Sequence, residues 1–197
     1  MARRKQSGKS PSGRLRIVAG NWRSRLLDVA GVEGLRPTSE RIRETLFNWL
    51  VPHVEGARCL DLFAGTGALG LEALSRGAAG VVFVERSAVA ASRLKANIEL
   101  LDADAATVVQ QDAFDYLRGA PDRGFDIVFL DPPFAAGLLE ETCRRLQDTR
   151  HLKQGALVYL ESDRSQAEVV LPVGWQVLKD KTAGNVRYML ARVDRSE

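Results

Sequence analysis

The sequence of 197 residues lacks most features of secreted and membrane proteins. Its two cysteines, Cys59 and Cys143, lie far apart, and two are too few for the disulfide framework of a small secreted domain. No apolar run approaches the roughly 18 residues that a membrane span needs, and the basic start lacks the apolar core of a signal peptide. We therefore expect a cytoplasmic protein in a reducing compartment, with no membrane association.

Histidine is also scarce. His53 and His151 have no cysteine or aspartate companions at ligand spacing, so the sequence predicts no metal site. The hydrophobic share of 45% and the charged share of 27% are ordinary for a globular protein, and they exclude a disordered or collagen-like chain. This length fits one domain.

Charge is unevenly distributed along the chain. Residues 1–27 contain eight Lys or Arg and no Asp or Glu, so the remainder carries −5 although the whole chain carries +3. We interpret 1–16 as a flexible basic arm and 17–197 as a single domain. A nucleic acid is the obvious partner for such an arm, and a solubilising tail is the alternative. The candidate contacts in this region are Arg14, Arg16, Arg23 and Arg25.

Apolar periodicity indicates an α/β fold. Residues 16–29 suggest one or two short strands, and Thr38 or Ser39 can start a helix that buries Ile42, Leu46, Trp49 and Leu50. Beyond residue 57, short apolar runs alternate with amphipathic segments, as in βα units with a mostly parallel sheet. Two segments with a strand-like pattern, on either side of residues 183–185, predict a final antiparallel hairpin. We expect strands at 58–63, 81–85, 107–111, 125–131, 156–161, 175–181 and 186–193, and helices at 68–76, 87–101, 113–117 and 138–147.

A glycine-rich segment at 61–70 joins the first strand of this series to a helix. Such a loop brings backbone N–H groups to the carboxyl edge of the sheet, where open α/β folds bind cofactors. Glu85, 20 residues after Gly65, can accept hydrogen bonds from ribose hydroxyls, which suits both NAD and S-adenosylmethionine. Asp61 is placed to meet a cation and Asp112 an adenine amine, and both favour S-adenosylmethionine. The predicted cofactor-binding residues are Asp61, Gly65, Thr66, Gly67, Gly70, Glu85, Asp112 and Ala113.

Each of the three acids also has a purely structural interpretation. Asp61 can brace the glycine turn, Glu85 can be a surface acid, and Asp112 can cap the helix that follows it. For Asp112, capping and cofactor contact are not exclusive.

The tetrapeptide Asp131-Pro132-Pro133-Phe134 follows a very apolar strand at the same edge. Consecutive prolines hold the backbone carbonyls in a fixed direction. The Asp131 carboxylate and the Pro132 carbonyl can each accept one hydrogen of an exocyclic amine, while Phe134 stacks on the base. We predict an in-line methyl transfer to an unpaired or flipped base, with the four residues as the catalytic group. An ordinary Asp-Pro turn is the structural alternative.

With these motifs the chain resembles the class I S-adenosylmethionine-dependent methyltransferases. It resembles most closely the bacterial family that methylates a guanine N2 amine in 16S ribosomal RNA. The resemblance is carried by GNWRSR at 20–25, RPTSERIRETLFN at 36–48, the glycine loop and the DPPF tetrapeptide, and it covers about residues 14–193. Ser24 departs from the pattern, because a glycine is commoner between the two arginines.

The resemblance implies a Rossmann-like, seven-stranded sheet with an antiparallel last strand. It implies 16S rRNA as the partner, within an assembled or partly assembled small ribosomal subunit, and a monomeric enzyme. The helix that follows the RPT residues is then expected to border the cofactor pocket, and the candidates for closing the pocket or for contacting RNA phosphate are Arg36, Thr38, Arg41 and Arg43.

Three other functions stay open. A DNA adenine-N6 methyltransferase could use the same tetrapeptide, although 197 residues leave little room for a duplex-reading module. An NAD-dependent oxidoreductase would explain the glycine loop but neither Asp61 nor DPPF. A non-catalytic RNA-binding or ribosome-assembly module would not need the intact tetrapeptide.

Overall fold

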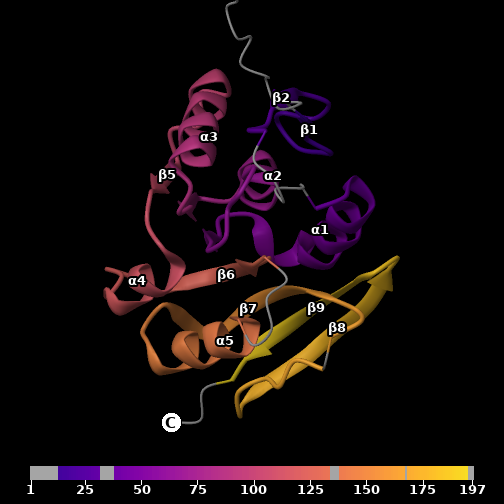
Figure 1. Cartoon of the computed structure of the whole chain (residues 1–197), viewed down its shortest axis with the longest axis vertical. Helices are drawn as coiled ribbons and strands as arrows, with labels where there is room; N and C mark the ends of the chain where they lie inside the picture. The colour runs from indigo at the N-terminus through magenta and orange to yellow at the C-terminus, as the bar shows by residue number, and fades with distance from the viewer. Residues whose placement is uncertain (1–12, 32–37, 134–137, 167, 195–197) are drawn as a thin grey trace, which may run out of the picture.

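The computed structural model describes residues 13–31, 38–133, 138–166 and 168–194. A seven-stranded sheet with the order β5-β4-β3-β6-β7-β9-β8 crosses the molecule, and a small two-stranded sheet, β1-β2, lies beside it (Figure 1). The strands are β1 (Arg14–Arg16), β2 (Leu26–Asp28), β3 (Arg58–Asp61), β4 (Gly80–Val84), β5 (Ala106–Val109), β6 (Phe125–Leu130), β7 (Leu152–Asp163), β8 (Trp175–Ala183) and β9 (Val186–Val193). The helices are α1 (Glu40–Val54), α2 (Ala68–Ser75), α3 (Ala88–Leu100), α4 (Ala113–Arg118) and α5 (Leu138–Asp148).

The sheet confirms the predicted fold class. Neighbouring strands are parallel from β5 through β7, whereas β9 is antiparallel to both β7 and β8. Most expected elements agree with the structure within two or three residues. β7 starts four residues earlier than predicted because Leu152 already pairs with Phe125 of β6. An irregularity in the β6–β7 register then follows, and the exposed residues 153–155 separate Leu152 from the apolar run.

Two apolar cores lie on opposite faces of the sheet. Successive side chains of a strand point to opposite faces, so β6 places Phe129 in one core and Val128 in the other. The first core packs under α1, α2 and α3, and the second under α4 and α5 (Figure 1). Because both faces are covered, the central strands read as continuous apolar runs. No helix in the described ranges is both long enough and apolar enough to traverse a membrane.

The β1–β2 hairpin corrects the predicted boundary of the basic arm. Residues 14–16 were assigned to the arm, yet they form β1, where Leu15 is buried opposite Leu27. An apolar side chain between two arginines is enough to anchor a strand to the core. The turn places Ser24 at φ 68°, a left-handed conformation that favours glycine. Residues 1–12 of the predicted arm lie outside the described residues.

Helix α1 starts where the sequence predicts. The Ser39 hydroxyl accepts a hydrogen bond from the Ile42 N–H at 3.3 Å and caps the helix. Leu46 and Leu50 are buried as expected. Trp49 is only partly buried and stacks on Tyr188 of β9, with the ring centroids 5.5 Å apart. Helix α1 therefore packs against the last strands as well as against the central sheet.

Candidate functional site

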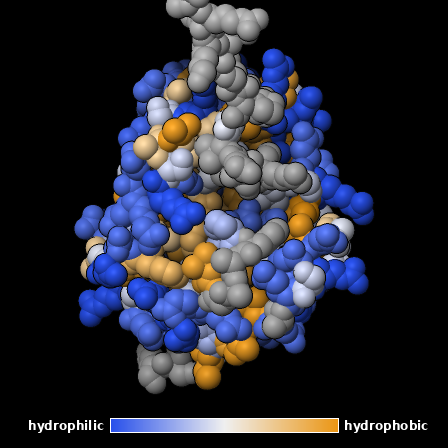
Figure 2. Space-filling view, viewed as in Figure 1, coloured by the Kyte–Doolittle hydropathy of each residue, from blue (hydrophilic) through white to orange (hydrophobic). Residues whose placement is uncertain are grey.

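A cavity of about 1030 Å³ lies at the carboxyl edge of the parallel strands. Its walls come from the segments that follow β3, β4, β5 and β6, together with the start of α1 and the tip of the β8–β9 hairpin. Hydrophilic residues cover most of the face seen in Figure 2, while apolar surface gathers in its middle and lower part. The cavity is large enough for a cofactor together with a base.

Asp61 ends β3 and lines the cavity. Its Oδ2 atom accepts a hydrogen bond from the Gly70 N–H at 3.0 Å, and the side chain is only 3% exposed. Burial raises the pKa of Asp61 to about 7, opposed by the Gly70 hydrogen bond and assisted by the charge of Glu85. Asp61 thus braces the glycine turn and also presents a carboxyl group to the cavity.

The glycines of the loop divide into two groups. Gly65, at φ 52°, lines the cavity together with Thr66. Gly67 and Gly70, predicted to bind the cofactor, are not in the cavity wall. A Cβ atom at Gly67 would approach Leu94 Cδ1 to 2.4 Å, and one at Gly70 would approach Phe83 Cε1 to 2.2 Å. These two glycines permit close packing of α2 on its neighbours, and their contact with the cofactor stays a prediction.

Glu85 is half-buried at the end of β4 and fixes the glycine loop. Its Oε2 accepts a hydrogen bond from the Gly65 N–H at 2.8 Å, and its Oε1 accepts one from the Ser87 N–H at 2.6 Å. It is not an ordinary surface acid. A carboxylate oxygen has room for a second donor, so both oxygens can still accept hydroxyl groups from the cavity side.

Asp112 has both roles that the sequence allowed. Its Oδ1 accepts a hydrogen bond from the Phe114 N–H at 2.8 Å and caps α4. Asp112 and Ala113 also line the cavity, together with residues of the glycine loop. The capping role leaves Oδ2 available to a ligand amine.

Asp131 follows β6 and lies beside a second acid, Glu161 of β7, which sequence reasoning missed. The Thr38 hydroxyl is 3.2 Å from Asp131 Oδ2 and 3.3 Å from Glu161 Oε2, so its one proton can be donated to either. The Tyr159 hydroxyl donates to Glu161 Oε2 at 2.8 Å. Like Asp61 and Glu85, Glu161 is an acid at the end of an apolar run, and this was the available signal.

The tetrapeptide is described only in part. Pro132 is buried, Pro133 is exposed, and both line the cavity next to Asp131. Phe134 lies outside the described residues.

The pKa values of Asp131 and Glu161 are both raised. Burial, followed by the charge of Glu161, raises the pKa of Asp131 well above its usual value. Burial also raises the pKa of Glu161, against hydrogen bonds from Tyr159 and Thr38. Within the described ranges, neither carboxylate has an ion pair with Lys or Arg. No His, Cys, Asp or Glu cluster suited to a metal ion occurs in those ranges either.

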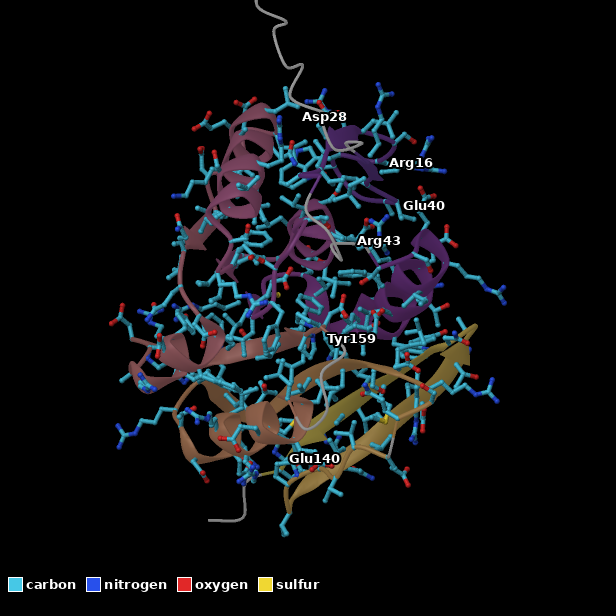
Figure 3. The ribbon with its side chains drawn as sticks, viewed as in Figure 1. Arg16, Asp28, Glu40, Arg43, Glu140 and Tyr159 are labelled. Carbon is cyan, nitrogen blue, oxygen red and sulfur yellow. The ribbon has the colours of Figure 1, made fainter. Side chains whose placement is uncertain are left out.

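The predicted RNA-binding arginines separate into exposed and buried ones. Exposed guanidinium groups are carried by Arg14, Arg16, Arg23, Arg25 and Arg41. Arg16 is 3.6 Å from Glu40, and these two and Arg43 lie on one side of the molecule in Figure 3. Arg36 lies outside the described residues.

Arg43 was expected to close the pocket or to contact phosphate, and the structure corrects this. It is 1% exposed, and its Nη1 is 3.2 Å from Glu72 Oε2. The other guanidinium nitrogens donate to the carbonyls of Arg16 at 2.8 Å and Thr38 at 3.2 Å. The helical period explains the burial, because Arg43 shares a face with Leu46 and Leu50. A side chain enclosed in this way cannot reach RNA.

Comparisons with known proteins agree with this architecture. The sequence model of the family described as Conserved hypothetical protein 95 matches residues 15–192. The chain belongs to this family. It is 47% identical over 188 residues to the Ribosomal RNA small subunit methyltransferase D of Escherichia coli K12, with 94% of this chain and 93% of that protein covered. A protein of the same name from Haemophilus influenzae is 45% identical over 181 residues, covering 90% of this chain and 93% of its own length.

The fold is shared with solved structures of the family's relatives. The structure of yhhF from Escherichia coli superposes with a TM-score of 0.86 at 43% identity, covering 92% of this chain and 99% of that one. The two proteins therefore share the fold over nearly their whole length.

Proposed function

We propose that this protein transfers a methyl group from S-adenosylmethionine to the exocyclic N2 amine of a guanine in 16S rRNA. The observation that carries the proposal is one cavity that joins the acids of the glycine loop to Asp131 and Pro132. The relatives covering nine-tenths of the chain bear the name of an rRNA small-subunit methyltransferase, which supports the same reaction.

The residues present fit S-adenosylmethionine. Asp61 offers a carboxylate to the ammonium group, Glu85 offers two oxygens to the ribose hydroxyls, and Asp112 offers Oδ2 to the adenine amine. An acid facing the cavity at Asp61 suits a cation and would repel a pyrophosphate, which disfavours NAD. When bound, S-adenosylmethionine supplies a methyl group on a positively charged sulfur, open to attack by an amine lone pair.

Asp131 and Pro132 act on the target amine. The Asp131 carboxylate and the Pro132 carbonyl each accept one amine hydrogen, which turns the nitrogen lone pair toward the methyl group. The nitrogen becomes acidic only after methylation, and Asp131 then receives its proton. The raised pKa of Asp131 suits that step, since a more basic carboxylate holds the proton better.

RNA is the substrate class that the charge distribution favours. Exposed arginines on the β1–β2 hairpin and on α1 can contact phosphates, and the basic residues 1–12 would extend that contact. A base in a loop can enter the cavity without the cost of opening a duplex. The substrate is then an assembled or partly assembled small subunit, and the enzyme acts as a monomer.

Methyl transfer from labelled S-adenosylmethionine tests the proposal. The acceptors are small-subunit particles, large-subunit particles, naked rRNA and adenine-rich DNA, and the products are digested to nucleosides. N2-methylguanosine from small-subunit material alone is expected. N6-methyladenine would move the target to adenine, and tight cofactor binding without transfer would favour the assembly module.

Asp131→Ala sharpens this test. We expect it to abolish transfer while cofactor affinity stays within a few-fold, because Asp131 contacts the amine. Asp122→Ala, at an exposed position outside the cavity, is the matched control. Equal loss of transfer and of cofactor affinity would assign Asp131 to the pocket wall.

A further inference from the structure

The sheet register brings Glu161 beside Asp131. Leu130 of β6 pairs with Leu160 of β7 in a parallel ladder, so the next residues, Asp131 and Glu161, lie at the same level of the sheet. Glu161 is 4% exposed, yet it lines the cavity together with Asp131. The base held at Asp131 must therefore also meet Glu161.

Among the described residues, only one oxygen of each carboxyl group accepts a hydrogen bond from the protein. Both hydrogen bonds to Glu161, from Tyr159 and Thr38, fall on Oε2, and the bond to Asp131 falls on Oδ2. Within the described part of the chain, Glu161 Oε1 and Asp131 Oδ1 have no hydrogen-bond partner. Glu161 is buried, and a buried acceptor without a donor is costly, so its free oxygen favours an N–H group that a ligand brings.

Guanine carries the matching donors. Its N2 amine and its N1–H lie side by side on one edge, whereas adenine has an amine beside an N1 lone pair. A carboxylate next to the amine acceptor would attract the guanine N1–H and repel the adenine N1. We propose that Glu161 accepts the N1–H of the target base and so selects guanine over adenine.

Two neighbours position Glu161 for this role. Tyr159 precedes it by two residues on the same face of β7, and its hydroxyl holds Oε2. Thr38 is the second donor, and its own carbonyl accepts a hydrogen bond from the buried Arg43 at 3.2 Å. The Tyr159 hydroxyl, and the Thr38 hydroxyl when it donates to Glu161, favour the ionised, accepting form of Glu161 against burial, which raises its pKa. This inference rests on the proposed function, because it concerns recognition of the base whose amine is methylated.

Nucleoside binding tests the proposal without turnover. The protein is saturated with S-adenosylhomocysteine and titrated, with NMR detection, with guanosine, with inosine, which lacks the amine, and with 2-aminopurine riboside, which keeps the amine but lacks N1–H. We expect Glu161→Gln to weaken guanosine and inosine about tenfold or more while 2-aminopurine riboside changes less than about threefold.

Asp131→Asn is the matched control. It should weaken guanosine and 2-aminopurine riboside alike, since both carry the amine, and leave their ratio unchanged. Tyr159→Phe should move the ratio in the direction of Glu161→Gln by a smaller factor, because Oε2 loses a donor but the carboxylate remains. It also serves as the second variant if Glu161→Gln does not fold.

An unchanged ratio of guanosine to 2-aminopurine riboside in a folded Glu161→Gln protein would overturn the proposal. In the transfer assay, Glu161→Gln should lower kcat/KM on small-subunit particles about tenfold with unchanged cofactor affinity, and full activity would also overturn it. The proposed function fails separately, if wild-type protein forms no N2-methylguanosine on those particles.

Discussion

Two groups of largely enclosed acids lie on this fold, and their partners differ. Glu72 of α2 is fully buried, and its carboxylate is paired with Arg43 at 3.2 Å and Arg76 at 2.8 Å. It also accepts hydrogen bonds from the N–H groups of Val18 and Ala19. Asp131 and Glu161 are paired with each other, through one threonine hydroxyl.

The difference separates a structural acid from a functional one. At Glu72 every oxygen is matched by protein donors, so the group links α1, α2 and the β1–β2 hairpin. At Asp131 and Glu161 the missing donors must come from outside the protein. A buried carboxylate short of donors at a cavity therefore indicates a ligand more directly than burial alone does.

Removal of Glu72 should give the largest effect. Glu72→Ala leaves Arg43 buried without its carboxylate and frees two backbone N–H groups, so we expect about 3–5 kcal/mol lower stability in urea unfolding. Asp115→Ala, which breaks an exposed pair with Arg118, is the control and should cost less than about 1 kcal/mol. Similar losses for the two variants would remove the contrast between the regions.

Asp131→Asn should raise the stability of the protein, whereas Glu72→Ala lowers it. The raised pKa of Asp131 means that the folded protein loses stability as pH rises from the usual carboxyl range through the raised value. Asparagine cannot ionise, so the ligand-free variant should gain about 0.5–2 kcal/mol at neutral pH, with no gain in acid, while methyl transfer is lost. Unfolding curves at the two pH values measure this, and destabilisation at neutral pH would contradict it.

Asp61 should make cofactor affinity depend on pH. Below a pH of about 7 it holds a proton in the ligand-free protein, which weakens its attraction for a cation. Affinity for S-adenosylmethionine should therefore rise, by up to tenfold per pH unit, as pH increases toward about 7, and then level off. Calorimetry on wild type and Asp61→Asn measures this, and the same pH dependence in both would assign it to another group.

Ser24→Gly should give the smallest change. The residue lies at φ 68° in the β1–β2 hairpin, where the preceding backbone at Val18 is hydrogen-bonded to Glu72 of α2, and glycine adopts this conformation without steric cost. The gain in stability is partly offset by the greater conformational freedom of glycine in the unfolded chain. We therefore expect a net stabilisation of up to about 1 kcal/mol. Thermal unfolding measures it, with Ser92→Gly on the exposed face of α3 as a destabilising control.

Much of the site was predictable because its residues are local in sequence. The loop 61–70, Glu85, Asp112 and Asp131 each follow an apolar strand, and parallel strands bring their carboxyl ends to one edge. Glu161 also ends an apolar run, but its role depends on the pairing of β7 with β6, and the sequence does not show which strands pair in the sheet. The RNA-binding role predicted for Arg43 was wrong for a similar reason, because Glu72, the acid that neutralises it, lies 29 positions away in the sequence.

The sequence by itself determined the order of the strands and helices, the glycine loop and the acids at the strand ends, because these depend on periodicity and on conformational limits of single residues. The tertiary structure decided which acids share a cavity, which glycines serve packing and which arginines are buried. Those properties arise from contacts between segments that are distant in the sequence. For example, Thr38 reaches Glu161, which Tyr159 also holds, only when the start of α1 packs beside β7.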